Sequence, residues 1–128
     1  MRILVATDGR AGILNPALGL AEAAAALVLE RDEAVQLHVH DIENGSAFAA
    51  LPPALQLAGR RDFGLPDGFD LVIGCGRQAV APLLGLKRAG SPAFTVFLGD
   101  PRVDPDRFDL VIAPGGAKGY EILEIGYA

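Results

Sequence analysis

The pentapeptide Phe-Asp-Leu-Val-Ile occurs twice in this chain, at 69–73 and at 108–112. Each copy leads into an uninterrupted apolar run, which is typical of strands that are buried on both faces of a parallel sheet. The first copy ends in the glycine turn 74–76, and Arg77 follows it. Parallel sheets place their ligands at the carboxyl ends of their strands. The repeat therefore predicts a parallel sheet with a binding site along one edge.

The remaining pattern predicts strands that alternate with helices. Asn15 and Pro16 are typical of the N-cap and the first residue of a helix. We expect strands at 2–7, 35–42, 70–74, 93–98, 109–113 and 121–125, long helices at 16–31 and 78–88, and short helical segments at 46–51 and 54–60.

This alternation predicts an α/β fold, namely one three-layer α/β/α Rossmann-like domain over residues 1–128 with a mostly parallel sheet. We expect the strand order 2-1-3-4-5-6, because the long segment 43–68 lets the chain cross from the second strand past the first. The order would reverse between the first and third strands. The loops 8–12 and 74–77 would then form opposite lips of one crevice.

The composition of the chain indicates which kinds of protein and which kinds of binding partner are excluded. Hydrophobic residues make up 51% of the chain, which suits a sheet covered on both faces. The longest apolar stretch, 17–29, contains Glu22 and is too short to span a bilayer, and no signal-peptide pattern opens the chain. We therefore expect a cytoplasmic protein. A net charge of −5 argues against nucleic-acid binding, and one cysteine excludes an internal disulfide.

Two glycine-containing loops are candidate anion sites. The first contains Asp8, Gly9, Arg10 and Gly12, and glycines there would let the backbone approach a phosphate beside a helix start. The alternative is an ordinary connection between a strand and a helix.

The second loop contains Gly74, Gly76 and Arg77. Arg77 stands where a helix begins, so its charge opposes the helix dipole, and a bound anion would explain that placement. Cys75 lies between the two glycines, and we interpret it as a small buried thiol rather than a nucleophile.

A third candidate loop follows the fourth strand and contains Asp100 and Arg102. Arg102 would clamp a ligand, or it would pair with a neighbouring aspartate. Asp8 and Asp100 are the candidates for a general base. His38 and His40 lie on one face of a strand, and we expect them to face solvent rather than to bind a metal. We expect no metal and no cofactor.

The segments 7–12 with 17–22, 73–78 with 81–82, and 100–102 with 108–114 together resemble the bacterial relatives of the plant mitochondrial-fission (elongated mitochondria) proteins. That family is regarded as related to GT-B glycosyltransferases, which use nucleotide sugars. The resemblance implies that this chain corresponds to the N-terminal Rossmann-like half. In GT-B enzymes the other half holds most of the donor, and the acceptor lies against this one.

From the resemblance we expect a glycosyltransferase-like domain with a crevice that binds an anion or an acceptor, and that is inactive as a lone half. Nucleotide sugars and glycan acceptors are the partners it implies, together with the missing C-terminal half or a second copy. Two alternatives stay open. One is a non-catalytic protein-interaction module that forms a homodimer, and the other is a free-standing nucleotide-binding protein.

Overall fold

The computed structural model describes residues 1–8, 11–31, 33–43, 45–60, 62–114 and 120–124. Within these residues one sheet has the strand order β2-β1-β3-β4-β5-β6, in which β6 is antiparallel to β5 and the other pairs are parallel. This confirms the predicted α/β class, the mostly parallel sheet and the strand order. The strands are β1 (Arg2–Thr7), β2 (Gln36–Asp41), β3 (Leu71–Cys75), β4 (Phe94–Leu98), β5 (Leu110–Pro114) and β6 (Tyr120–Glu124).

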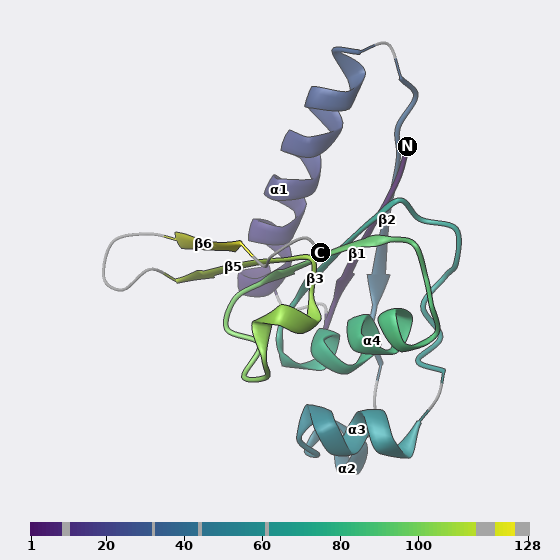
Figure 1. Ribbon diagram of the computed structural model, residues 1–128, viewed down its shortest axis with the longest axis vertical. Coiled ribbons are helices and arrows are strands. Elements are labelled where there is room, and N and C mark those ends of the chain that lie inside the picture. The colour runs from purple at the N-terminus through teal and green to yellow at the C-terminus, as the bar shows by residue number, and fades with distance from the viewer. Residues whose placement is uncertain (9–10, 32, 44, 61, 115–119, 125–128) are drawn as a thin grey trace.

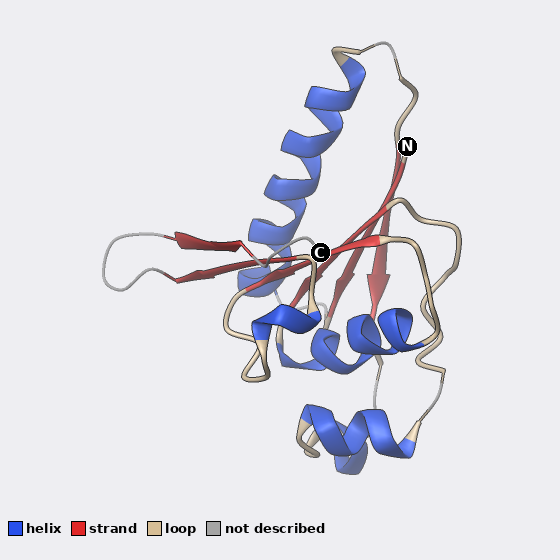
Figure 2. Cartoon of the chain, in the orientation of Figure 1, coloured by secondary structure: helices blue, strands red, loops and turns tan. Residues whose placement is uncertain are grey.

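Helices cover both faces of the sheet (Figures 1 and 2). On one face, Ala17 and Ala21 of the first helix pack on alternate residues of β1, β3 and β4. On the other face, Ala79 and Leu83 pack on the remaining residues of the same strands. The three-layer arrangement is therefore confirmed. The helices are α1 (Ala11–Leu29), α2 (Ser46–Ala49), α3 (Pro53–Gly59) and α4 (Arg77–Arg88), with a 3-10 turn η1 (Pro105–Arg107).

The first helix begins earlier than predicted. We expected it over 16–31, with Pro16 as its first residue, but α1 runs from Ala11 to Leu29 and contains Pro16. The missing N–H of Pro16 removes one hydrogen bond from the ladder of α1. The remaining ladder outweighs that loss, and connections between a strand and a helix in such folds are commonly only two to six residues long. A sequence pattern typical of a helix start is thus used inside a helix.

The repeated pentapeptide has one structural role in both copies. Asp70 accepts a hydrogen bond from the N–H of Arg2 at 2.8 Å, and the N–H of Asp70 donates to the Arg2 carbonyl at 2.9 Å. Asp109 makes the same reciprocal pair with Thr95, at 2.8 and 3.1 Å. The preceding phenylalanine is buried in the α4 side of the core in both copies. Each copy therefore fastens its strand to the amino end of the neighbouring strand.

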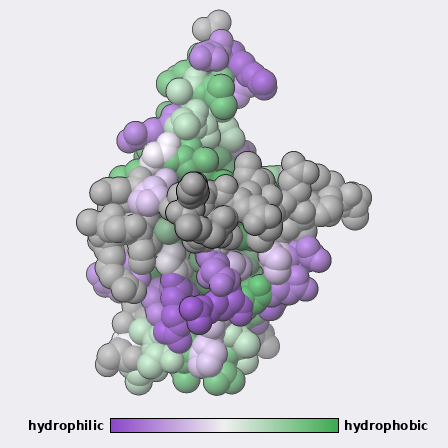
Figure 3. All heavy atoms as spheres, turned by 90° about the vertical axis from the view of Figure 1, so that its left-hand side faces the viewer, coloured by the Kyte–Doolittle hydropathy of each residue, from purple (hydrophilic) through white to green (hydrophobic). Residues whose placement is uncertain are grey.

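One part of the molecule is less covered than the rest. The carboxyl-terminal half of α1 extends beyond the sheet, and hydrophobic residues lie along it (Figures 1 and 3). Leu27 and Leu29 are 64% and 57% exposed. Leu37 and Val39 of the edge strand β2 are exposed as well. The predicted position of the second strand near the sheet edge is confirmed. Among the described residues, no helix combines the length and the apolar character that crossing a membrane requires.

Candidate functional site

The strand order reverses between the parallel strands β1 and β3, as predicted. The neighbours of β1 are β2 on one side and β3 on the other. After β1 the chain enters α1 on one face of the sheet, and after β3 it enters α4 on the other face. Thr7 pairs with Cys75 at the carboxyl ends of these strands. Asp8 and Gly76 therefore follow adjacent strand ends, at the point where α/β folds bind ligands.

Cys75 lies at this edge as a buried thiol. Burial raises its pKa to about 11, and the negative charge of Asp8 adds to this effect, while a hydrogen bond with the Gly76 backbone opposes it. At neutral pH the thiol stays protonated, and a protonated thiol is a poor nucleophile. The interpretation of Cys75 as a small buried residue agrees with this geometry.

The two glycines beside Cys75 differ in role. A Cβ atom at Gly74 would lie 2.7 Å from Leu83 of α4, so the absence of a side chain lets α4 pack closely on β3. Gly76 has a φ of +92°, a backbone conformation that favours glycine, and it is the N-cap of α4. Glycine has no side chain that could cap the helix, so the first N–H groups of α4 have no side-chain cap. Gly74 thus allows close packing of α4 on β3, whereas Gly76 leaves the N–H groups at the amino end of α4 without a side-chain cap.

Arg77 is turned toward α2. Its guanidinium donates hydrogen bonds to the carbonyl oxygens of Ala49, Ala50 and Leu51, at 2.6, 3.1 and 2.7 Å. The amide of Gln78 also donates to the Ala49 carbonyl, at 2.9 Å. The positive charge of Arg77 is unfavourable at the amino end of α4, and hydrogen bonds to carbonyl oxygens at the end of α2 compensate for it.

A third side chain, which no pattern in the sequence marked, completes this attachment of α2 to α4. Gln56 of α3 is 1% exposed, and its amide donates to the carbonyl of Phe48 and to the side-chain oxygen of Gln78, at 3.0 and 3.1 Å. Its own Oε1 has no hydrogen-bond partner among the described residues. The partners are separated by 8 and 22 residues, so no local pattern could have predicted them.

The loop after β4 holds an exposed cation. The N–H of Arg102 donates to Asp100 Oδ1 at 2.9 Å, and Arg102 has a φ of 55°. Within the described part of the chain, its guanidinium has neither an ion pair nor a hydrogen bond. Asp104 instead accepts from the N–H of Asp106. Arg102 is therefore available to a ligand at the strand end next to β3.

The other predicted site residues are placed as follows. Gly12 lies in the first turn of α1, while Gly9 and Arg10 lie outside the described residues. His38 is exposed and packs its ring edge against Phe69, with 5.3 Å between ring centres. The described residues contain no group of three or more side chains that could hold a metal ion.

A family model described as "Mitochondrial fission ELM1" matches residues 11–115, which is most of the chain. No curated protein and no solved structure matches the chain.

Proposed function

The chain belongs to the mitochondrial fission ELM1 family, and we propose that it is a glycosyltransferase-like domain that binds an anionic group of a nucleotide sugar or a glycan acceptor. In this proposal it corresponds to the N-terminal half of a GT-B enzyme. The anion would lie in a crevice where β1 and β3 end. The residues that would line it are Asp8, Gly9, Arg10, Gly12, Gly76, Arg77, Asp100 and Arg102, whereas Gly74 is buried against α4.

One observation carries this proposal: α1 and α4 follow the carboxyl ends of the adjacent strands β1 and β3, so both helix amino ends lie at the same edge of the sheet. The N–H groups of a helix amino end and its dipole attract anions. The amino end of α4 has no side-chain cap, and Arg102 follows the adjacent strand with its guanidinium unpaired among the described residues. These groups supply both hydrogen-bond donors and a positive charge, which are what a phosphate or carboxylate requires.

The proposal assigns different roles to the charged residues. Arg102 would pair with the anion directly, and Arg77 would contribute its backbone N–H while its guanidinium holds α2. Asp8 and Asp100, which follow the ends of β1 and β4, are the candidates for a base at the carboxyl edge of the sheet. An aspartate in that place would take a proton from an acceptor hydroxyl.

A thermal-shift titration tests this proposal. UDP, GDP, ADP and their sugar nucleotides are each added to the wild type and to Arg10→Ala and Arg102→Ala. A ligand at about ten times its Kd adds about 1.4 kcal/mol, a rise in Tm of about 3–6 °C. We expect one nucleotide class to give this rise and both variants to lose it. The matched control is Arg31→Ala, which lies beyond the other end of α1. Equal responses in all four proteins, or none, would refute the proposal.

A second candidate function is a protein-interaction module, and the exposed leucines and valine of α1 and β2 favour it. Leu27 and Leu29 expose apolar surface on α1, and Leu37 and Val39 expose it on the edge strand β2. Sedimentation equilibrium with and without nucleotide separates the two candidates. Self-association that Leu37→Glu abolishes and that nucleotide leaves unchanged would favour the module, and a monomer at all concentrations would exclude self-association.

A further inference from the structure

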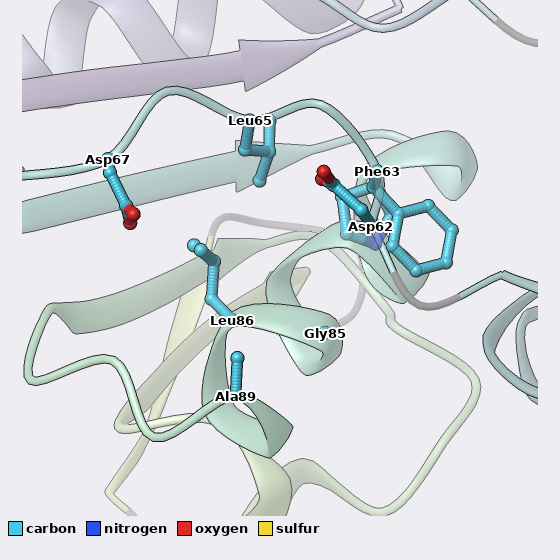
Figure 4. A pocket seen from close by; sticks show the side chains of 8 residues that line it. Asp62, Phe63, Leu65, Asp67, Gly85, Leu86 and Ala89 are labelled. Carbon is cyan, nitrogen blue, oxygen red and sulfur yellow. The ribbon is translucent and has the colours of Figure 1, made fainter.

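A cavity of about 290 Å³ lies between the segment 62–67 and the carboxyl-terminal half of α4. Asp62, Phe63, Leu65 and Asp67 line one wall, and α4 provides the other (Figure 4). The α4 residues are Pro82, Gly85 and Leu86, with Ala89 just beyond the helix. No residue of the proposed crevice lines this cavity, so the two sites are independent.

The walls of this cavity are held by specific contacts. A Cβ atom at Gly85 would lie 3.0 Å from the ring of Phe63, so a glycine inside α4 lets the ring lie against the helix backbone. Asp62 accepts a hydrogen bond from the N–H of Gly64 at 2.7 Å, which fixes one end of the segment. At the other end, Arg2 donates to the carbonyl oxygen of Asp67 at 3.3 Å. The cavity is thus a built feature of the fold.

Its charge is negative and its floor is apolar. Figure 4 shows the carboxylates of Asp62 and Asp67 at two ends of the cavity, with Leu65 and Leu86 between them. The carboxylate of Asp67 has no ion pair and no hydrogen bond among the described residues. A ligand that fits must therefore offer positive charge together with an apolar body.

The nearest cations of α4 are held by other groups. Arg88 donates to the carbonyl oxygens of Leu57 and Arg60, at 2.8 and 2.9 Å. Lys87 forms an ion pair with Asp109. Neither side chain therefore neutralises the carboxylates that face the cavity.

We propose that this cavity binds a small organic cation, an amidinium or guanidinium group carried on a compact apolar body. The charged group would pair with Asp67 at the rim, and the apolar body would lie against Phe63, Leu65 and Leu86. A volume of about 290 Å³ corresponds to about ten water molecules, so a ligand of about ten non-hydrogen atoms fits. Neutral and anionic compounds of the same shape would bind more weakly.

Benzamidine and benzamide provide a matched pair of probes, since they have the same size and shape and differ in charge. Each is titrated to about 10 mM into ¹⁵N-labelled full-length protein, and amide shifts are followed by NMR, a range chosen for millimolar affinities. We expect benzamidine to shift the amides of Phe63, Leu65, Leu86 and Ala89. Benzamide should bind about two- to fivefold more weakly, because it lacks the charge that pairs with the exposed carboxylate of Asp67.

Two variants locate the effect. Asp67→Asn keeps the shape and removes the charge, and we expect it to weaken benzamidine binding about fivefold. Asp106→Asn makes the same chemical change at an exposed carboxylate outside the cavity and should leave binding unchanged. The proposal is wrong if benzamide binds as well as benzamidine, if both variants behave alike, or if the cavity amides do not shift.

Discussion

Replacing Asp109 by alanine should destabilise the fold more than any other single aspartate change in the repeat. Its Oδ2 accepts hydrogen bonds from the N–H and hydroxyl of Thr95, at 2.8 and 3.1 Å, and it pairs with Lys87. Thr95 is 0% exposed, so its N–H would be left buried without this partner. An unsatisfied buried donor costs about 1–3 kcal/mol, and a partly exposed ion pair adds less than about 1 kcal/mol.

We therefore expect Asp109→Ala to lower the free energy of unfolding by about 2–3 kcal/mol, and Tm by about 6–12 °C for a domain of this size. Asp70→Ala is the matched control, because Asp70 makes the same reciprocal pair but is exposed. Water can replace its carboxylate, so the expected loss is about 0.5–1 kcal/mol. Urea unfolding followed by circular dichroism measures both. Equal losses, or a loss below about 1 kcal/mol for Asp109→Ala, would refute the reasoning.

Acid should reduce the difference between the wild type and Asp109→Ala. Burial raises the pKa of Asp109, but hydrogen bonds from Lys87 and Thr95 outweigh burial and hold the pKa below the usual value of an aspartate. The pKa of an aspartate in the unfolded chain is about 3.9. Because the folded pKa is lower, the carboxylate stabilises the fold fully at pH values above about 3.9, and this stabilisation decreases as the pH falls below it. The difference in unfolding free energy should thus be constant from about pH 5 to 8 and narrow below about pH 4. A difference that widens in acid would contradict this assignment.

Three further changes test the packing around the site. Gly74→Ala should lower the free energy of unfolding, measured in urea, by about 1–3 kcal/mol, because the new Cβ would lie 2.7 Å from Leu83. An unchanged midpoint of urea unfolding would show that α4 can shift freely. Arg77→Ala should speed amide hydrogen exchange at 46–51 without speeding it in the core of β3, because α2 loses three hydrogen bonds; uniform acceleration would point to global destabilisation instead. Cys75 should react with iodoacetamide about 300-fold more slowly at pH 7.5 than an ordinary cysteine, since its pKa is about 11 rather than about 8.5. Reaction at the rate measured in 8 M urea would mean that the thiol is exposed.

The sequence was sufficient for the fold because the signals for it are local. The two Phe-Asp-Leu-Val-Ile copies and the alternation of strands and helices carry the hydrophobic periods that define buried strands. The strand order followed from the length of the segment between β2 and β3, which lets the chain cross past β1. The start of α1 was mispredicted because Asn15 and Pro16 form a helix-start pattern that the structure places inside the helix.

The side-chain contacts around the site could not be predicted in the same way. Arg77 was interpreted from its local position at a helix start, but its hydrogen bonds reach residues 26 to 28 positions away. Gln56 and the cavity at Asp67 likewise depend on how α3 and the segment 62–67 lie on α4. Such polar contacts follow from the assembled fold, and no periodicity in the sequence encodes them.

The most direct test of the central claim is to locate where a nucleotide binds. ¹⁵N-labelled protein is titrated with UDP, and the amide shifts are mapped on the structure. We predict shifts concentrated at the carboxyl edge of the sheet, at Asp8, Gly76, Arg77 and Arg102, with saturation in the micromolar to millimolar range. Shifts that cluster elsewhere, or an unchanged spectrum at about 10 mM UDP, would contradict an anion site where β1 and β3 end.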